Sequence, residues 1–381
     1  MRFHIDQEFL DHFKGLHQVF LYLTDECNLR CSLCEYKPSI SFHLKEREIG
    51  LETATDLIAD FKEMGASKLS LVGGEPTLYG ASRGNRPLLD VIDGAKDMGY
   101  EHVCMVTNGM FQGSLLAREQ LRRLDELTFS LDGFTAEIND PLRGRGTFDR
   151  CVSNVRRAVE LGYRVGIKSN AHQGLLQRGE GGALPLDAMV RFAASLGAAF
   201  IDIHSPRGCG VPMDAWTGGQ GVCIEEWIGV YRELRGRIDS GEYHISVRLP
   251  QCYVTRQEFE RDMEYYSYCA AKMGERVLVH PDGMLRICSA LLSTPYGVAR
   301  FYDDRIAWDR SSTNELVSHR LAMPTPCTNR GKGAAPGNYV PLCLHFKPGQ
   351  DEFVWNERLD WEGRRRVYQA RELPGPVTPV G

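Results

Sequence analysis

Residues 24–34 read Thr24-Asp25-Glu26-Cys27-Asn28-Leu29-Arg30-Cys31-Ser32-Leu33-Cys34, and this stretch limits the fold more than any other part of the chain. Three thiolates in a C-x3-C-x2-C spacing on one short loop suit three irons of a cubane 4Fe–4S cluster. No fourth cysteine follows nearby, so the fourth iron would be open to another ligand. Two alternatives remain: a zinc site with His43 as its nearest fourth ligand, and three buried free cysteines.

Three further motifs each follow an apolar run. They are Gly73-Gly74-Glu75-Pro76 after Leu69–Val72, Thr107-Asn108-Gly109 after Val103–Val106, and Ser130-Leu131-Asp132-Gly133. Alone, the first would be an ordinary strand-to-helix turn, but in this order behind the cysteines the set resembles the radical S-adenosylmethionine (SAM) superfamily. The resemblance implies that the open iron binds the amino and carboxylate groups of SAM. An electron then cleaves the S–C5′ bond and gives a 5′-deoxyadenosyl radical.

The same resemblance implies which residues hold SAM. Gly73 and Gly74 would let the backbone approach closely, and Glu75 would face the amino group. Contacts to the methionine carboxylate and the ribose are carried over to Asn108, Ser130, Lys168, Ser169 and Asn170. The family prefers an aromatic residue where this chain has Leu33, and Tyr36 follows two residues after Cys34, so the residue that stacks on adenine is left open.

The stretch Asp140-Pro141-Leu142-Arg143-Gly144 also resembles one that is common in radical SAM enzymes with SPASM or twitch extensions. Its Arg143 is expected to pair with a carboxylate of SAM or of the substrate. A solvated surface arginine is the alternative.

Composition limits the class of protein. The chain has 381 residues, 43% of them apolar, and a net charge of −5 without a basic stripe, which predicts a globular protein that does not bind nucleic acid. Neither a secretory leader nor an apolar stretch of membrane-spanning length occurs, so we expect a cytoplasmic protein with no membrane partner. In that compartment, the twelve cysteines indicate metal ligands, catalytic thiols or buried side chains, and not disulfides.

Alternating apolar runs and amphipathic patterns predict the fold class, an α/β protein with a partial (β/α)6 TIM-like barrel over residues 17–240, after an N-terminal segment 1–16. Strands are expected at residues 19–23, 69–72, 103–106, 127–131, 165–167 and 200–203. Helices are expected near residues 51–64, 87–98, 114–124, 149–161, 186–196 and 224–239. The apolar runs look continuous, which predicts burial on both faces of the sheet. Chemistry in such barrels collects at the C-terminal ends of the strands.

From residue 241 to about 350 the alternation stops. Residues 276–280, Pro281-Asp282-Gly283 and residues 284–288 predict a β-hairpin. Together with four cysteines, this part resembles a small twitch-type extension of the SPASM/twitch kind, which holds an auxiliary 4Fe–4S cluster. The expected ligands are Cys269, Cys288, Cys327 and Cys343. The alternatives are that two or more of these are core cysteines, or that Cys252 replaces one. Residues 351–381 are expected to form a surface tail.

The last barrel strand supplies the expected catalytic residues. His204 ends it and is a candidate base, with a structural histidine as the alternative. Arg207 is a candidate cation for a carboxylate, and Cys209 is a candidate hydrogen donor, although a non-catalytic role is the more usual one for a free cysteine. Residues 174–182 form a glycine-rich loop after the fifth strand, which is either a substrate lid or a plain mobile loop.

The resemblance leaves two substrate classes open. The first is a small polar intermediate of natural-product biosynthesis, such as a sugar, aminocyclitol or nucleoside, which would be dehydrogenated, decarboxylated or epimerised. The second is a ribosomally made peptide or protein. The short segment before Cys27 favours the first, because it is too short for an independent leader-binding domain. Either enzyme would use SAM, two 4Fe–4S clusters and an external electron donor such as flavodoxin or ferredoxin. A non-enzymatic electron carrier remains the contrasting class.

Overall fold

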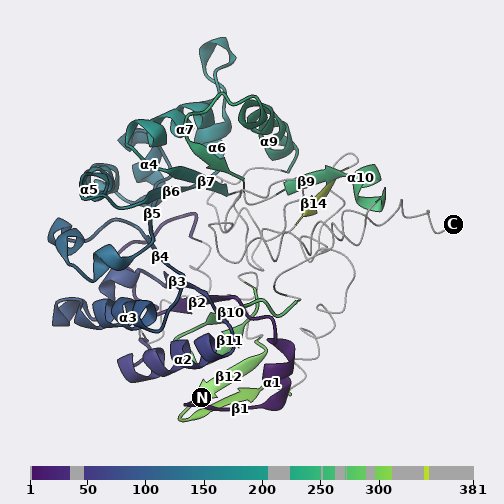
Figure 1. The fold of residues 1–381 in the computed structure, drawn as a ribbon. Helices are drawn as coiled ribbons and strands as arrows, with labels where there is room; N and C mark the ends of the chain where they lie inside the picture. The colour runs from purple at the N-terminus through teal and green to yellow at the C-terminus, as the bar shows by residue number, and fades with distance from the viewer. Residues whose placement is uncertain are drawn as a thin grey trace.

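The computed structural model describes residues 2–34, 47–204, 224–249, 252–261, 271, 273–288, 297–310 and 339–342. Its centre is one curved twelve-stranded sheet (Figure 1) in the order β1-β13-β12-β11-β10-β2-β3-β4-β5-β6-β7-β8. These strands are β1 (His4–Ile5), β2 (Gln18–Tyr22), β3 (Lys68–Val72), β4 (His102–Thr107), β5 (Glu126–Ser130), β6 (Val165–Asn170), β7 (Phe200–His204), β8 (Ser246–Arg248), β10 (Arg276–Val279), β11 (Met284–Arg286), β12 (Ala299–Tyr302) and β13 (Arg305–Trp308). A separate pair joins β9 (Cys252–Thr255) and β14 (Tyr339–Leu342).

The six predicted barrel strands are confirmed as β2 to β7, and all of them run parallel. A seventh parallel strand, β8, follows β7. The main helices are α1 (Gln7–His12), α2 (Leu51–Glu63), α3 (Arg86–Asp97), α4 (Ala136–Arg143), α5 (Thr147–Glu160), α6 (Gln173–Leu176), α7 (Pro185–Ser195), α9 (Ile224–Asp239) and α10 (Arg256–Arg261). The helices α2, α3, α5 and α7 lie on the outer side of the sheet (Figure 1), so the partial α/β barrel is confirmed.

The helix predicted at residues 114–124 is wrong. Two short 3₁₀ helices, η3 (Gly113–Ala117) and η4 (Leu121–Arg123), occupy this stretch. Arg118 between them is extended, with φ −70° and ψ 130°. Leu116 and Leu121 are both fully buried, so each turn is anchored in the core separately and one continuous helix is not formed.

The predicted hairpin is present as β10 and β11, with Leu278 opposite Arg286 and Val279 opposite Leu285. Strand β10 also pairs in parallel with β2, so the hairpin continues the barrel sheet on the side away from β3. Whether it belongs to a twitch extension, and where the domain boundaries lie, remain predictions.

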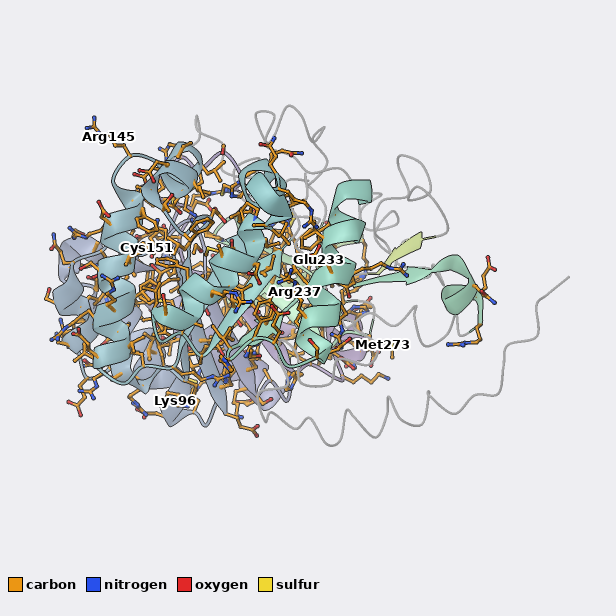
Figure 2. All side chains as sticks on the ribbon, turned by 90° about the horizontal axis from the view of Figure 1, so that it is seen from above. Lys96, Arg145, Cys151, Glu233, Arg237 and Met273 are labelled. Carbon is orange, nitrogen blue, oxygen red and sulfur yellow. The ribbon has the colours of Figure 1, made fainter. Side chains whose placement is uncertain are left out.

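The core extends over both halves of the chain and includes Phe9, Leu57, Phe129 and Val277, all fully buried. Figure 2 shows Cys151 of α5 inside the molecule, whereas Arg145 lies at the periphery. None of the described helices is long and apolar enough to cross a membrane.

The predicted burial of the strands on both faces agrees with the structure, because β2 to β5 are buried over almost their whole length, but polar side chains occupy part of the inner face. Gln18, Lys68, Glu126, Arg248 and Arg276 are all buried and line the cavity inside the sheet. Gln18, Lys68 and Glu126 directly precede the apolar runs that defined the predicted strands. Arg248 lies in β8, where no strand was predicted, and Arg276 is the first residue of the predicted hairpin.

Candidate functional site

A cavity of about 350 Å3 lies inside the barrel, a volume typical of small-molecule sites. Most of the predicted site residues line it together: Cys27, Cys31, Leu33, Cys34, Gly73, Gly74, Glu75, Asn108, Ser130, Arg143, Lys168, Asn170 and His204. Ser169 is buried but is not among the lining residues. The predicted residues Tyr36, Arg207, Cys209, Cys269, Cys327 and Cys343 lie outside the described residues. Cys288 is described, half-buried directly after β11, and does not line this cavity.

The cysteine loop leaves the C-terminal end of β2 and is held from several sides. The backbone N–H of Glu26 donates to the Thr24 hydroxyl at 3.0 Å, and Arg30 donates to the Cys27 carbonyl at 2.9 Å. The N–H of Ser32 donates to the Leu142 carbonyl at 2.9 Å, which docks the end of α4 on the loop. These contacts fix the backbone of the loop, and all three of its cysteines line the cavity.

The donor set fits an iron–sulfur cluster better than a single metal ion. Burial raises the pKa of Cys27 to about 12, and the charges of Glu75, Cys34 and Cys31 act in the same direction. Among the described residues, no group of three or more His, Cys, Asp or Glu side chains converges on one ion site. A cubane does not need such convergence, because each cysteine binds a different iron, and its positive charge favours ionised thiols. The zinc alternative depended on His43, which lies outside the described residues.

Gly73 and Gly74 are required by packing against the cysteine loop. A Cβ on Gly73, which has φ +150°, would lie 2.6 Å from the Thr24 carbonyl oxygen, and one on Gly74 would lie 2.1 Å from the Glu26 oxygen. Two backbone hydrogen bonds join these segments: the Gly74 N–H donates to the Thr24 carbonyl oxygen at 2.8 Å, and the Glu75 N–H donates to the Glu26 carbonyl oxygen at 2.7 Å. The motif after β3 is therefore a backbone clamp on the residues that precede Cys27.

Glu75 is almost fully buried and joins two strand ends. Its carboxylate accepts hydrogen bonds from the Thr77 hydroxyl at 2.7 Å, the Thr107 hydroxyl at 2.7 Å and the Asn108 backbone N–H at 2.7 Å. The backbone N–H of Thr77 adds a fourth at 3.1 Å. Burial raises the pKa of Glu75, while these donors oppose the shift. Glu75 thus fixes the turn after β4 relative to the turn after β3.

Asn108 connects the turn after β4 to the cysteine loop. Its side-chain amide donates to the Asn28 side-chain oxygen at 2.8 Å and lies 3.8 Å from the Cys27 sulfur. Its own side-chain oxygen accepts from the backbone N–H of Met110 at 2.8 Å. This turn supports the first cysteine in addition to any contact with a cofactor.

Arg143 is not a solvated surface arginine. Its side chain is 9% exposed, and its Nε lies 2.7 Å from the carboxylate of Asp132, which is 1% exposed. The other Asp132 oxygen accepts from the backbone N–H of Asn170 at 2.7 Å. A buried ion pair between Asp132 and Arg143 thus joins the motif after β5 to the end of α4, and both side chains line the cavity.

The rest of the stretch around Arg143 is structural. Asp140 accepts hydrogen bonds from the backbone N–H groups of Gly146 at 2.6 Å and Phe148 at 2.9 Å, at the start of α5. Gly144 and Gly146 take the positive φ values 119° and 80° that the turn needs. This leaves Arg143 as the one side chain of the stretch that reaches the cavity.

Two features of the cavity were not expected from the sequence. Cys104, a buried residue of β4, lines the cavity with its sulfur 3.2 Å from the Ser70 hydroxyl oxygen. Arg248 stacks on Phe200 at 3.6 Å from the ring centre, and lies 3.9 Å from both Glu126 and Asp202. A period of two along these strands was the signal that would have identified the polar inner face.

Comparison with known proteins agrees with the geometry. The model of the radical SAM superfamily matches residues 21–180. GTP 3′,8-cyclase of Limosilactobacillus fermentum is 29% identical over 156 residues, which cover 40% of this chain and 45% of that protein. Molybdenum cofactor biosynthesis protein 1 of Drosophila melanogaster is 31% identical over 153 residues, which cover 39% of this chain and 26% of that protein. The chain thus spans less than half the length of these two relatives.

Two solved structures share the fold. Streptococcus suis SuiB bound to S-adenosylmethionine has a TM-score of 0.57 and 16% identity, covering 74% of this chain and 62% of that one. The enzyme anSMEcpe with bound AdoMet has a TM-score of 0.52 and 15% identity, covering 72% and 75%. At such low identity these likenesses concern the fold alone. Residues 21–180, which carry the cysteine loop and the strand-end motifs, form a radical SAM domain.

Proposed function

We propose that this chain is a radical SAM enzyme that removes one hydrogen atom from a small polar substrate held in the barrel cavity. The observation that carries the proposal is that Cys27, Cys31 and Cys34 line the same cavity as His204, which ends the last predicted barrel strand. When bound, the cluster and SAM would supply a 5′-deoxyadenosyl radical. Every other requirement falls on the protein, which must position SAM, exclude water and manage a proton.

The cysteine loop would hold three irons, and the clamp made by Gly73 and Gly74 would keep that loop in place. Asn108, Ser130, Lys168 and Asn170 line the same cavity and would contact the methionine and ribose parts of SAM. Arg143 is positioned by Asp132, so its remaining N–H groups would meet a carboxylate of SAM or of the substrate. Leu33 is buried at the cavity wall and offers adenine an apolar surface.

Two-electron dehydrogenation is the leading reaction. The substrate would lose a hydrogen atom to the radical, then one electron to an auxiliary 4Fe–4S cluster and one proton to His204. We assign that cluster to Cys269, Cys288, Cys327 and Cys343. Decarboxylation, with Arg143 or Arg207 binding the carboxylate, and epimerisation, with a thiol such as Cys209 as the hydrogen donor, are the competing outcomes.

The substrate class is proposed as a sugar, aminocyclitol or nucleoside on the way to a natural product. The relatives named GTP 3′,8-cyclase support a nucleoside-like molecule. A peptide substrate is the second candidate, because SuiB was also solved with a precursor peptide and shares the fold at a TM-score of 0.58. The proposed location is the cytoplasm.

Anaerobic reconstitution tests the proposal. The wild type should bind about eight irons in two cubanes and form 5′-deoxyadenosine from SAM. The variant C27A/C31A/C34A should keep about four irons and form none. If this variant still forms 5′-deoxyadenosine, the assignment of the cysteine loop is wrong.

Deuterated substrates then separate the two substrate classes and the reactions. A small substrate should transfer label to 5′-deoxyadenosine, and dehydrogenation should leave no solvent deuterium at the attacked carbon. Epimerisation should introduce one atom of solvent deuterium there. Label transfer only from a peptide with its leader would support the peptide candidate instead.

A further inference from the structure

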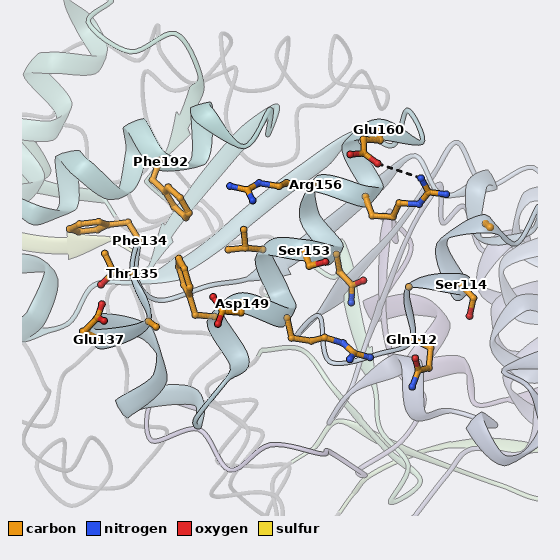
Figure 3. A pocket seen from close by; sticks show the side chains of 18 residues that line it. Gln112, Ser114, Phe134, Thr135, Glu137, Asp149, Ser153, Arg156, Glu160 and Phe192 are labelled. Carbon is orange, nitrogen blue, oxygen red and sulfur yellow. Dashed lines mark hydrogen bonds and ion pairs between the residues drawn. The ribbon is translucent and has the colours of Figure 1, made fainter.

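A surface hollow of about 600 Å3 lies beside the cysteine loop, on the outside of the barrel. It is lined by Leu78 and Ala81 from the turns after β3, by Met110 after β4, and by Arg118 and Arg150. A second hollow, of about 1090 Å3, runs along α5 and shares Gln112, Ser114 and Arg150 with the first. Figure 3 shows Gln112 and Ser114 at one end of this larger hollow and Phe134 and Phe192 at the other.

The first hollow is connected directly to the cysteine loop. The side-chain amide of Asn28 donates to the Met110 carbonyl at 3.0 Å, and Asn28 also accepts from Asn108. Asn28 is exposed and follows Cys27, which is half-buried. The rim of the hollow is therefore one residue away from a proposed cluster ligand. A molecule seated there would approach the cluster from outside, without entering the cavity that holds SAM and the substrate.

The charge of the first hollow is positive. Arg118 and Arg150 are both exposed, and no acidic residue occurs among the described residues that line it. Arg150 donates to the Phe111 carbonyl at 2.9 Å, which orients its guanidinium without neutralising it. Arg30, on the cysteine loop itself, is a further exposed cation. Met110 adds a half-buried apolar surface, and arginine and methionine are both enriched at protein interfaces.

The larger hollow carries charges of both signs. Its three cations, Arg150, Arg156 and Arg157, are matched in number by three acids, Glu137, Asp149 and Glu160, and Arg157 pairs with Glu160 at 3.4 Å (Figure 3). Its far end is aromatic, with Phe148 stacked on Phe192 at 5.8 Å. Among the described residues that line the two hollows, an excess of positive charge thus occurs in the first hollow and not in the larger one.

We propose that this end is the docking surface for a small acidic protein that carries one electron. The inference rests on the proposed function, because reductive cleavage of SAM requires an electron from outside the chain. Complementary charge raises the rate and specificity of association more than its affinity, which suits a transient electron-transfer encounter. Carboxylates around the redox group of the carrier would meet Arg118, Arg150 and Arg30, and its apolar edge would meet Met110.

The test compares a protein reductant with a small one. The rate of 5′-deoxyadenosine formation is measured for the reconstituted wild type and for R118E/R150E. Each protein is assayed once with purified reduced flavodoxin and once with dithionite as the electron donor. Neither arginine lines the SAM cavity, and the Phe111 carbonyl keeps a hydrogen bond from Asn154 at 3.1 Å in the variant. We expect the flavodoxin-driven rate to fall about tenfold or more while the dithionite-driven rate is unchanged.

Two control variants keep the result interpretable. R118K/R150K retains both charges and should restore the flavodoxin-driven rate and its decrease with added salt. K14E/R300E makes the same charge change at exposed residues outside both hollows and should behave as the wild type. Equal flavodoxin-driven rates for the wild type and R118E/R150E, with equal iron contents, would overturn the docking surface.

Failure of the proposed function would look different. In that case the wild type would form no 5′-deoxyadenosine with dithionite. Flavodoxin binding, measured by titration calorimetry at low salt, would still test the docking surface, since R118E/R150E should lose it. Equal binding by the wild type and this variant would overturn the inference independently of activity.

Discussion

Replacement of Gly74 with alanine should separate the turn after β3 from the cysteine loop. The new Cβ would stand 2.1 Å from the Glu26 oxygen and 2.6 Å from the Asp25 oxygen, and both are backbone atoms that no rotamer change can move. Contacts this short require a shift of roughly 1 Å, and overpacking of this kind typically costs about 1–3 kcal/mol. The two backbone hydrogen bonds of the clamp would weaken as well, at about 1 kcal/mol each.

A displacement of about 1 Å at a catalytic centre can reduce rates about a hundredfold, and we expect such a loss in 5′-deoxyadenosine formation by G74A. Hydrogen exchange of the Gly74 and Glu75 amides should become faster in the same variant. G94A in α3 is the matched control, because its Cβ would meet nothing closer than 4.0 Å and the helix should gain about 1 kcal/mol. G74A with wild-type turnover and wild-type amide protection would refute the clamp.

Two further predictions concern the buried network behind the cavity. Replacement of Arg143 with methionine, or of Asp132 with asparagine, should lower the free energy of unfolding by about 3–5 kcal/mol, because each change leaves a buried charged partner without its ion pair. Urea denaturation measures this loss. A loss below about 1 kcal/mol would contradict the buried ion pair. His172, whose Nε2 lies 2.7 Å from the Asp132 carbonyl oxygen, has a pKa lowered by burial. The unfolded chain then binds the proton more readily, so this histidine should reduce stability as the pH falls below about 6.5, and H172Q should show a weaker loss over that range in thermal melts.

The sequence was sufficient to predict the repeating part of the fold. The strands β2 to β7 and helices such as α2 and α5 appeared within a few residues of their predicted positions, because buried parallel strands and amphipathic helices leave strong periodic patterns. The helix predicted at residues 114–124 was wrong because the leucines there fit a helical spacing, whereas Leu116 and Leu121 are buried in the core from two separate turns.

The candidate site was predicted as a set of residues but not as a set of contacts. Motifs placed Gly74, Glu75 and Arg143 near SAM, and the structure places all three at one cavity. Their hydrogen bonds and ion pair to other parts of the protein, including the link between Arg143 and Asp132, depend on which loops meet in space. No pattern within a short window carries that information.

The position of β10 has a consequence for the synthesis of the protein. Strand β2, which leads into the cysteine loop, pairs on one side with β3 and on the other with β10, roughly 250 residues later in the chain. At ribosomal rates of 5–20 residues per second, the second edge of β2 stays without its partner for about 13–50 s. Unpaired strand edges favour aggregation, so a nascent chain should depend on chaperones during this interval. Co-expression with a chaperone, or slower synthesis at low temperature, should raise the yield of soluble protein before any cluster is inserted.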